Sequence, residues 1–223
     1  MNDTNLKFYE QLLRLHLFQG VGRADLAQIV GHSKIGFETF KQGEVIANAD
    51  SGYDNMKFIT NGTASVIATA KDASYSITEY ISAPYTIQPE KMFGLSQTFS
   101  RTFVAATLCN IMTMSKEEIL KLTDEILIFR LNLLNTYTTM IQKQDNQLWQ
   151  MQPLQLEKRI AQWIISRCLT ATGQKTIKIK MKTLAQELND SRLDISKALN
   201  RMQQKGLILL SRGKIYIPQT EML

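Results

Sequence analysis

The sequence predicts an α+β protein with an antiparallel roll of short strands, then a long helix, then a small basic unit of helices and strands. Three observations support this class: short alternating apolar runs over residues 35–113, an uninterrupted helical pattern over 115–149, and cationic charge concentrated after residue 150. Because 223 residues exceed one typical domain of ~100–150, more than one compact unit is expected. We expect boundaries at 1–114, 115–150 and 151–223.

Composition excludes several classes of protein. The chain has no run of 18 apolar residues and its first residues are polar, so we expect a soluble, cytoplasmic protein without membrane association. Cys109 and Cys168 are too few for a disulfide framework or a cysteine-ligated iron–sulfur cluster, and we interpret both as buried thiols. No metal site and no cofactor are predicted.

The N-terminal half begins with apolar residues at helical spacing over 5–30, which predicts short helices. From Ile35 to about Thr113 the pattern changes to short runs rich in Thr, Ser, Ile and Val, separated by turn signals such as Gln42-Gly43 and Asn61-Gly62. Many short strands at this spacing indicate an antiparallel barrel or roll.

The segment 115–149 contains neither Pro nor Gly and predicts one long helix. Ile126, Leu133 and Met140 stand seven apart, and a neighbouring stripe carries Leu127, Leu131, Leu134 and Ile141. This combined stripe is wider than one small domain needs to cover, so the helix is expected to pair with a second copy and form a homodimer. The alternative is a helix packed only on its own roll.

The C-terminal third carries the basic character of the chain. Residues 1–150 have a net charge of −2, whereas residues 151–223 have +8. A helix is predicted at Gln155–Leu169 and a strand with one wet, basic face at 176–181. Such a charge favours a polyanionic partner, although a solvated surface explains charge alone equally well.

Residues 181–206 have the pattern of a helix-turn-helix. Leu184 and Leu188 bury a short first helix, and Asn189 occupies the tight turn, where a left-handed backbone is needed. Ser191 caps the second helix, with Asp194 completing a capping-box pattern. The buried positions of the second helix are Ile195, Leu199 and Met202.

The remaining face of the second helix carries groups that can read bases or bind phosphates. Two apolar runs then flank Ser211–Lys214, which predicts a hairpin, or wing, with a cationic tip. The predicted DNA-binding residues are Ser191, Arg192, Leu193, Ser196, Lys197, Asn200 and Arg201, with Arg212 and Lys214 at the wing.

Four stretches resemble the Crp/Fnr family of bacterial transcription regulators: 15–21, 40–66, 156–164 and 184–208. The resemblance implies a cyclic-nucleotide-binding-type β-roll (jelly roll), a dimerisation helix and a C-terminal winged helix-turn-helix. It also implies a homodimer on a palindromic double-stranded DNA operator, with RNA polymerase as a further candidate partner. Arg192 falls where the family opens its recognition helix. Leu193 replaces an acidic residue that is frequent in the family, which affects the target sequence.

The resemblance also locates a candidate effector pocket, formed by Gly94, Arg101, Thr102, Ile141 and Gln142. In family members that bind cyclic nucleotides, a Gly-Glu pair holds the ribose, whereas this chain has Gly94 followed by Leu95, expected to be buried. Ile141 and Gln142 stand where a cyclic-AMP receptor presents hydroxyl groups. We therefore expect a regulator that does not depend on cyclic AMP and whose effector is not identified.

Two other functions compete with DNA binding. A metal-dependent β-barrel enzyme lacks ligands, because the chain has only His16 and His32 and neither stands on a predicted strand. The same scarcity of ligands argues against haem, so the protein is not expected to be an enzyme or a haem sensor. The stronger alternative is a ligand-sensing roll that acts through a protein partner docked on the basic unit.

Overall fold

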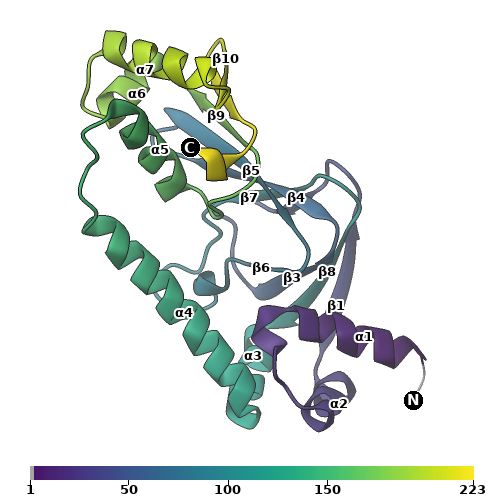
Figure 1. Ribbon diagram of the computed structural model, residues 1–223. Coiled ribbons are helices and arrows are strands. Elements are labelled where there is room, and N and C mark those ends of the chain that lie inside the picture. Colours follow the sequence, from purple (N-terminus) through teal and green to yellow (C-terminus); the bar gives the residue numbers. More distant parts are fainter. Residues whose placement is uncertain (1–2) are drawn as a thin grey trace. The chain divides into compact units, whose positions relative to one another are not determined.

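The computed structural model describes residues 3–223 and divides them into two compact units. We call residues up to Ala64 together with Ile81–Asn146 the N-terminal unit, and Ser65–Tyr80 together with Gln147–Leu223 the C-terminal unit. The mixed α/β fold expected from the sequence is confirmed (Figure 1).

The N-terminal unit begins with the expected short helices and continues as antiparallel strands. Its helices are α1 (Asp3–Arg14), the 3-10 turn η1 (His16–Phe18), α2 (Arg23–His32), the 3-10 turn η2 (Pro89–Lys91), α3 (Lys116–Glu125) and α4 (Leu127–Leu148). Its strands are β1 (Ile35–Phe40), β2 (Val45–Ala47), β3 (Asn55–Asn61), β6 (Tyr85–Ile87), β7 (Thr102–Ala105) and β8 (Cys109–Ser115). The hairpin strands β4 (Thr63–Thr69) and β5 (Tyr75–Ser82) leave this unit after Ala64 and return to it at Ile81.

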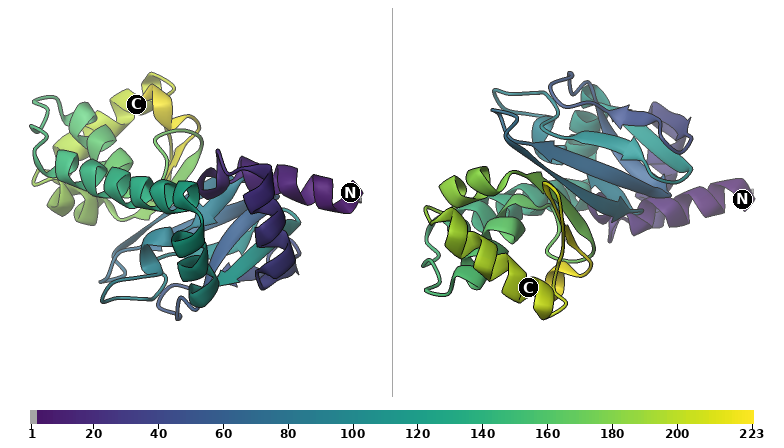
Figure 2. Two further views of the ribbon diagram at one scale, coloured as in Figure 1. Left: turned by 90° about the horizontal axis from the view of Figure 1, so that it is seen from below. Right: turned by 90° about the horizontal axis from the view of Figure 1, so that it is seen from above.

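A four-stranded sheet in the order β1-β8-β3-β6 forms the centre of the N-terminal unit (Figure 2). Alternation places Met56 and Phe58 of β3 on its buried face, opposite Met114 and Met112 of β8. Phe18 lies within 5.8 Å of Phe58, centroid to centroid, so the turn η1 closes this core. The alternating runs thus predicted the strands correctly.

The single helix expected over 115–149 is two helices, which corrects the prediction. Ile126 leaves the helical region with φ −121° and ψ 100°, between α3 and α4. Its N–H still bonds to the Leu122 carbonyl, and its own carbonyl accepts from Arg130, so the break leaves neither group unpaired. The reorientation buries both Leu122 and Phe129, an arrangement that depends on tertiary packing and not on a helix-breaking residue.

The two stripes predicted on this segment have different environments in α4. Ile126, Phe129 and Leu133 are buried within the N-terminal unit, and Asn132 donates from Nδ2 to the carbonyls of Leu17 and Gln19. The neighbouring stripe is exposed and consists of Leu127, Leu131, Leu134 and Ile141. One side of α4 is therefore covered by its own unit and the other is open.

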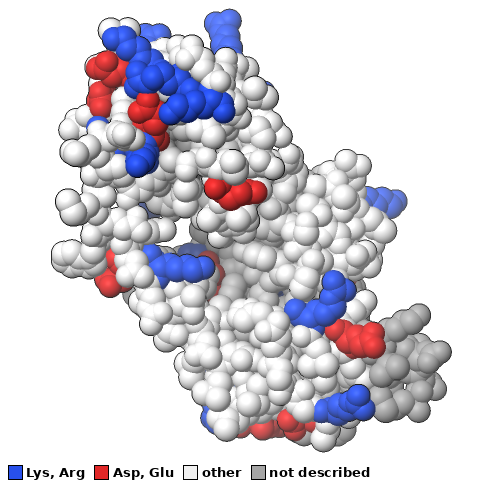
Figure 3. Space-filling model, in the orientation of Figure 1, with Lys and Arg blue, Asp and Glu red and all other residues white. Residues whose placement is uncertain are grey.

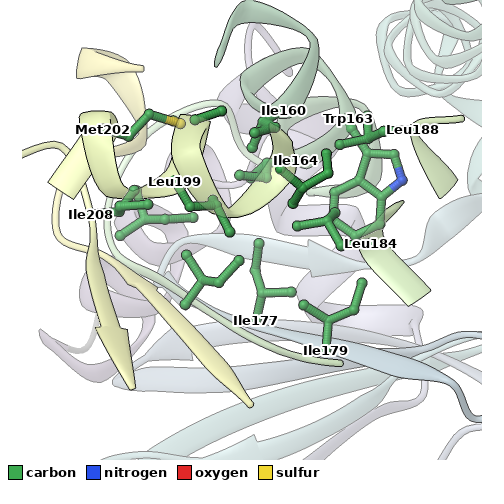
Figure 4. Close-up of a cluster of buried hydrophobic side chains, with 14 of the residues drawn as sticks. Ile160, Trp163, Ile164, Ile177, Ile179, Leu184, Leu188, Leu199, Met202 and Ile208 are labelled. Atoms are coloured by element: carbon green, nitrogen blue, oxygen red, sulfur yellow. The ribbon is translucent and has the colours of Figure 1, made fainter. Parts of the chain in front are cut away.

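The C-terminal unit places three helices against an antiparallel sheet. Its elements are α5 (Leu156–Arg167), β9 (Lys175–Ile179), α6 (Met181–Glu187), α7 (Arg192–Gln204), β10 (Leu209–Ser211), β11 (Lys214–Ile217) and the 3-10 turn η3 (Thr220–Met222). Within this unit the strand order is β10-β11-β9-β5-β4. Figure 4 shows Ile177 and Ile179 pointing from β9 toward apolar side chains of the helices, including Leu199.

Candidate nucleic-acid interface

The turn between α6 and α7 is held as the sequence predicted. Asn189 adopts a left-handed φ of 48°, and the Ser191 hydroxyl accepts a 3.0 Å hydrogen bond from the Asp194 N–H while donating to its carboxylate at 2.6 Å. Arg159 of α5 anchors the turn, because its guanidinium forms a 3.0 Å ion pair with Asp190 and also donates to the Leu188 carbonyl. The start of α7 is therefore fixed from two sides.

Helix α7 has one buried and one exposed face. Ile195, Leu199 and Met202 are at most 1% exposed, as predicted, and Ala198 joins them. Six of the seven predicted DNA-binding residues at α7 are exposed, namely Ser191, Arg192, Leu193, Lys197, Asn200 and Arg201, and Ser196 is half-buried. These side chains share one surface because the spacing of the buried set leaves that face free.

The cations of this face differ in how freely they can meet a ligand. Arg201 donates from Nε to Glu157 of α5 at 2.5 Å, and this hydrogen bond lowers the pKa of the Glu157 carboxyl. Lys197 is 3.8 Å from Asp194, a loose contact between two exposed groups. Arg192 takes part in no ion pair formed among residues 3–223. Arg192 and Lys197 are thus better placed for an anion than Arg201.

The wing forms as a short hairpin of β10 and β11, with Arg212 in the turn and Lys214 paired with Ser211. Lys214 also lies directly opposite Lys178 of β9, and both are exposed. Like charges opposite one another destabilise a sheet, and an anionic partner relieves that repulsion. Sequence reasoning read Lys178 as one residue of a wet strand face and did not connect it with the wing.

The basic surface extends beyond the residues predicted. Lys180 and Lys182 are exposed where β9 leads into α6, and Lys205 follows α7. In Figure 3 blue side chains gather in the region of α6 and α7 of Figure 1. The alternation of residues 176–181 was the available signal for Lys178 and Lys180.

The five predicted effector residues lie in different elements of the N-terminal unit. Gly94 is exposed in a loop with φ 91°, and Thr102 uses its hydroxyl to accept from the Ala49 N–H. Ile141 and Gln142 are exposed, with Ile141 on the open stripe of α4. Arg101 is half-buried directly before β7. Their grouping as an effector pocket stays a prediction of the family resemblance.

The expectation of a buried Leu95 is wrong, because its side chain is fully exposed. The acidic group of this region is Glu90, in the short turn η2, and sequence reasoning missed it. Its Oε2 atom is buried without a hydrogen-bond partner among the residues described. Burial together with the negative charge of Glu90 raises the pKa of Tyr137 to about 12. A turn of three residues is too short to produce a hydrophobic periodicity, so the sequence pattern could not predict that Glu90 is buried.

A crevice of about 650 Å3 lies elsewhere in the N-terminal unit. Its lining includes His16, Thr86, Thr136 and Lys143, and none of the predicted effector residues. His16 lies 2.6 Å from the Thr136 hydroxyl, and burial lowers the pKa of its imidazole. The side chain of His32, considered as a ligand, lies outside the described residues.

Cys109 is buried as expected, and burial raises the pKa of its thiol, whereas Cys168 is only half-buried. Within residues 3–223, no group of three or more His, Cys, Asp or Glu side chains is arranged to hold a metal ion. None of the helices in the described part of the chain is long and apolar enough to cross a membrane.

Comparison with known proteins agrees with this geometry. Residues 158–223 match the family model of the Crp-like helix-turn-helix domain. Catabolite activator protein from Thermus thermophilus is similar over 91% of this chain and 93% of its own, with 16% identity and a TM-score of 0.53. The sensor domain of the transcriptional regulator DNR from Pseudomonas aeruginosa is similar over 70% of this chain and all of its own, with 14% identity and a TM-score of 0.55. No curated protein sequence matches the chain.

The C-terminal segment, residues 158–223, therefore matches a Crp-like helix-turn-helix domain. Along most of its length the chain also shares the fold of catabolite activator protein.

Proposed function

We propose that the chain is a dimeric, sequence-specific DNA-binding transcription regulator, with the exposed face of α7 entering the major groove. The observation that carries this proposal is the pairing of a rigid, capped helix start with an exposed cationic face at Arg192 and Lys197. An arginine at such a position can form two hydrogen bonds with a guanine edge. Arg212 and Lys214 of the wing are proposed to bind phosphates.

The homodimer is proposed from the exposed stripe of α4. The stripe recurs at spacings of four, three and seven and its side chains are 44–81% exposed, which matches the seam of a paired helix; its residues are Leu127, Leu131, Leu134, Ile141 and Leu148. A partner copy would cover this apolar surface and present two recognition helices. Sedimentation of Leu131→Lys should show monomers, because two copies of one buried leucine contribute about 3 kcal/mol, or ~100-fold in dissociation constant.

Leu120→Lys is the matched control for this dimer test, since Leu120 is also exposed but lies on α3, away from the stripe. It should leave the association unchanged. A wild-type chain that sediments as a monomer at micromolar concentration would contradict the proposed dimer.

We also propose that cyclic AMP is not the effector. In support, Ile141 and Gln142 offer no hydroxyl groups, and Leu95 stands where a cyclic-nucleotide site would need a glutamate. Calorimetric titration with cyclic AMP should give no saturable heat. Saturable binding of cyclic AMP that also raises the affinity for DNA would overturn the proposal that cyclic AMP is not the effector, and would leave the proposed DNA recognition unaffected. Contact with RNA polymerase stays a prediction of the family resemblance.

Selection of duplexes by the purified protein tests DNA recognition directly. A dimer should enrich a two-fold palindrome with half-site centres ~10–10.5 bp apart. Arg192→Ala should reduce the preference for the selected operator over random duplex by ~10–100-fold, the cost of one lost bidentate base contact. Arg23→Ala removes an exposed arginine of α2 and should change nothing.

If no duplex is enriched, the proposal fails. The protein would then fit the alternative function, a ligand-sensing roll acting through a protein partner.

A further inference from the structure

The unit that carries the helix-turn-helix is built from two separate stretches of chain. Residues 65–80, the hairpin of β4 and β5, belong to it together with residues 147–223. The chain therefore passes between the two compact units three times: after Ala64, after Tyr80 and after Asn146. The crossing after Asn146 is therefore only one of three covalent connections between the two units.

Strand β5 extends the sheet of the wing by antiparallel pairing with β9. Five residue pairs are in register, from Tyr75 opposite Ile179 to Glu79 opposite Lys175. Without the hairpin, β9 would be an edge strand with unpaired backbone groups along one side. The hairpin thus satisfies backbone groups of the C-terminal unit that the 147–223 segment leaves open.

Apolar and aromatic side chains of β5 complete the core under α5. Ile77 is 1% exposed and lies opposite Ile177 in the same hydrophobic cluster. The ring of Tyr75 lies 5.2 Å from that of Trp163, centroid to centroid, and its hydroxyl accepts a 2.9 Å hydrogen bond from Arg167. The hairpin therefore contributes to the core that supports the recognition helix.

A buried ion pair anchors the end of this pairing. The Glu79 carboxylate lies 3.0 Å from the Lys175 amine, and both side chains are at most 1% exposed. Glu79 also accepts from the backbone N–H groups of Leu169 at 2.8 Å and Thr170 at 3.2 Å, and Lys175 donates to the Thr170 hydroxyl at 2.7 Å. A buried charge is tolerated when its partner and its hydrogen bonds are all present. Strand β5 therefore supplies the carboxylate that the buried lysine of β9 needs, and β9 supplies the cation that the buried glutamate of β5 needs.

We propose that the β4–β5 hairpin is an integral part of the DNA-binding unit, anchored by the Glu79–Lys175 pair, and that it stays docked while the protein is bound to DNA. The hairpin then couples the N-terminal unit to the recognition helix directly, in addition to the segment that follows α4. A displacement of β4 or β5 at Ala64 or Ile81 would be passed to the sheet that carries the wing.

Amide hydrogen exchange of the full chain tests the docking without reference to DNA. Lys175→Met leaves Glu79 buried without its cation, and should raise exchange at least ~10-fold at both 75–79 and 175–179, with β3 unchanged. Glu79→Leu should do the same, and the double variant should return both strands to within ~3-fold of wild type, since it removes both charges. Exchange that rises in β9 alone, or in neither strand, overturns the proposal.

A disulfide between the strands tests whether the hairpin stays docked on DNA. Thr78 and Thr176 are opposite in register and half-buried, so Thr78→Cys/Thr176→Cys in a Cys168→Ala background can cross-link them. Cys168→Ala alone is the control. The oxidised protein should bind its selected duplex within ~2-fold of the reduced protein.

Loss of at least ~10-fold on oxidation, restored by reductant, would show that the hairpin must leave and would overturn the proposal. Failure of the disulfide to form in the folded chain would also contradict it. This second test rests on the proposed function. If the reduced protein binds no duplex, that function fails, while hydrogen exchange still decides whether the hairpin is docked.

Discussion

Replacing Lys214 at the wing by alanine tests how the protein holds DNA. To Arg212 and Lys214 of the wing, which we assign to phosphates, we add Lys197 of α7 as a third exposed cation in contact with a phosphate, which makes six in a dimer. Each neutralised phosphate contributes about −0.9 to the slope of log K against log salt concentration, so the expected slope is about −5. Affinity should then fall ~10³-fold between 50 and 200 mM salt.

Lys214→Ala removes two of these contacts from the dimer. The slope should become about −3.6, and the same change in salt should cost only ~150-fold. Discrimination between the operator and a random duplex should stay as in the wild type, because a phosphate contact carries no sequence information. Fluorescence anisotropy at four salt concentrations measures both quantities.

Lys34→Ala is the control for this experiment, since it removes one exposed lysine from the N-terminal unit, directly before β1. Its slope should equal that of the wild type. An unchanged slope in Lys214→Ala would show that the wing does not touch phosphates. A changed operator preference would show that Lys214 reads bases, and either result refutes the assignment.

Three further outcomes are expected. Ser191→Ala should lower the free energy of unfolding by ~1 kcal/mol in urea denaturation, because the cap to Asp194 is lost, and Ser191→Thr should keep most of it. Gly62→Ala should cost more than Gly43→Ala, since both have positive φ but only at Gly62 would a Cβ meet backbone, 2.3 Å from the Leu108 carbonyl oxygen; equal denaturation midpoints would refute this. Burial lowers the pKa of His16 in the folded chain below its ordinary value of 6.5. As the pH falls through 6.5, the unfolded chain therefore binds more protons than the folded chain, so the free energy of unfolding should fall from pH 7 to pH 5. His16→Gln should flatten that dependence, and an equal fall in the variant would contradict it.

Sequence patterns predicted correctly those features that depend on interactions between neighbouring residues. The cap at Ser191, the left-handed turn at Asn189 and the buried spacing of Ile195 and Leu199 each depend on a few adjacent residues, so they could be read directly. The β-strands followed in the same way from alternation. The break at Ile126 could not be read, because packing and not a Pro or Gly imposes it.

In the predicted effector region, burial depends on contacts between residues that are distant in the chain, so it could not be predicted from the sequence. The family analogy that grouped Gly94 and Arg101 also expected Leu95 to be buried, yet the Leu95 side chain is fully exposed. Glu90 lies in a three-residue turn without periodicity, and its burial follows from the elements around it.

By itself the sequence determined the class of fold, the recognition helix with its cap, and the basic character of the C-terminal third, because periodicity, capping and charge are properties of short segments. Only the tertiary structure decided which stripe of α4 is covered and which is open. It alone joined Glu79 to Lys175, 96 residues apart, as a buried pair between β5 and β9. Nothing near either residue in the chain marks that pairing, because burial and the partner of a charge are set by the whole fold.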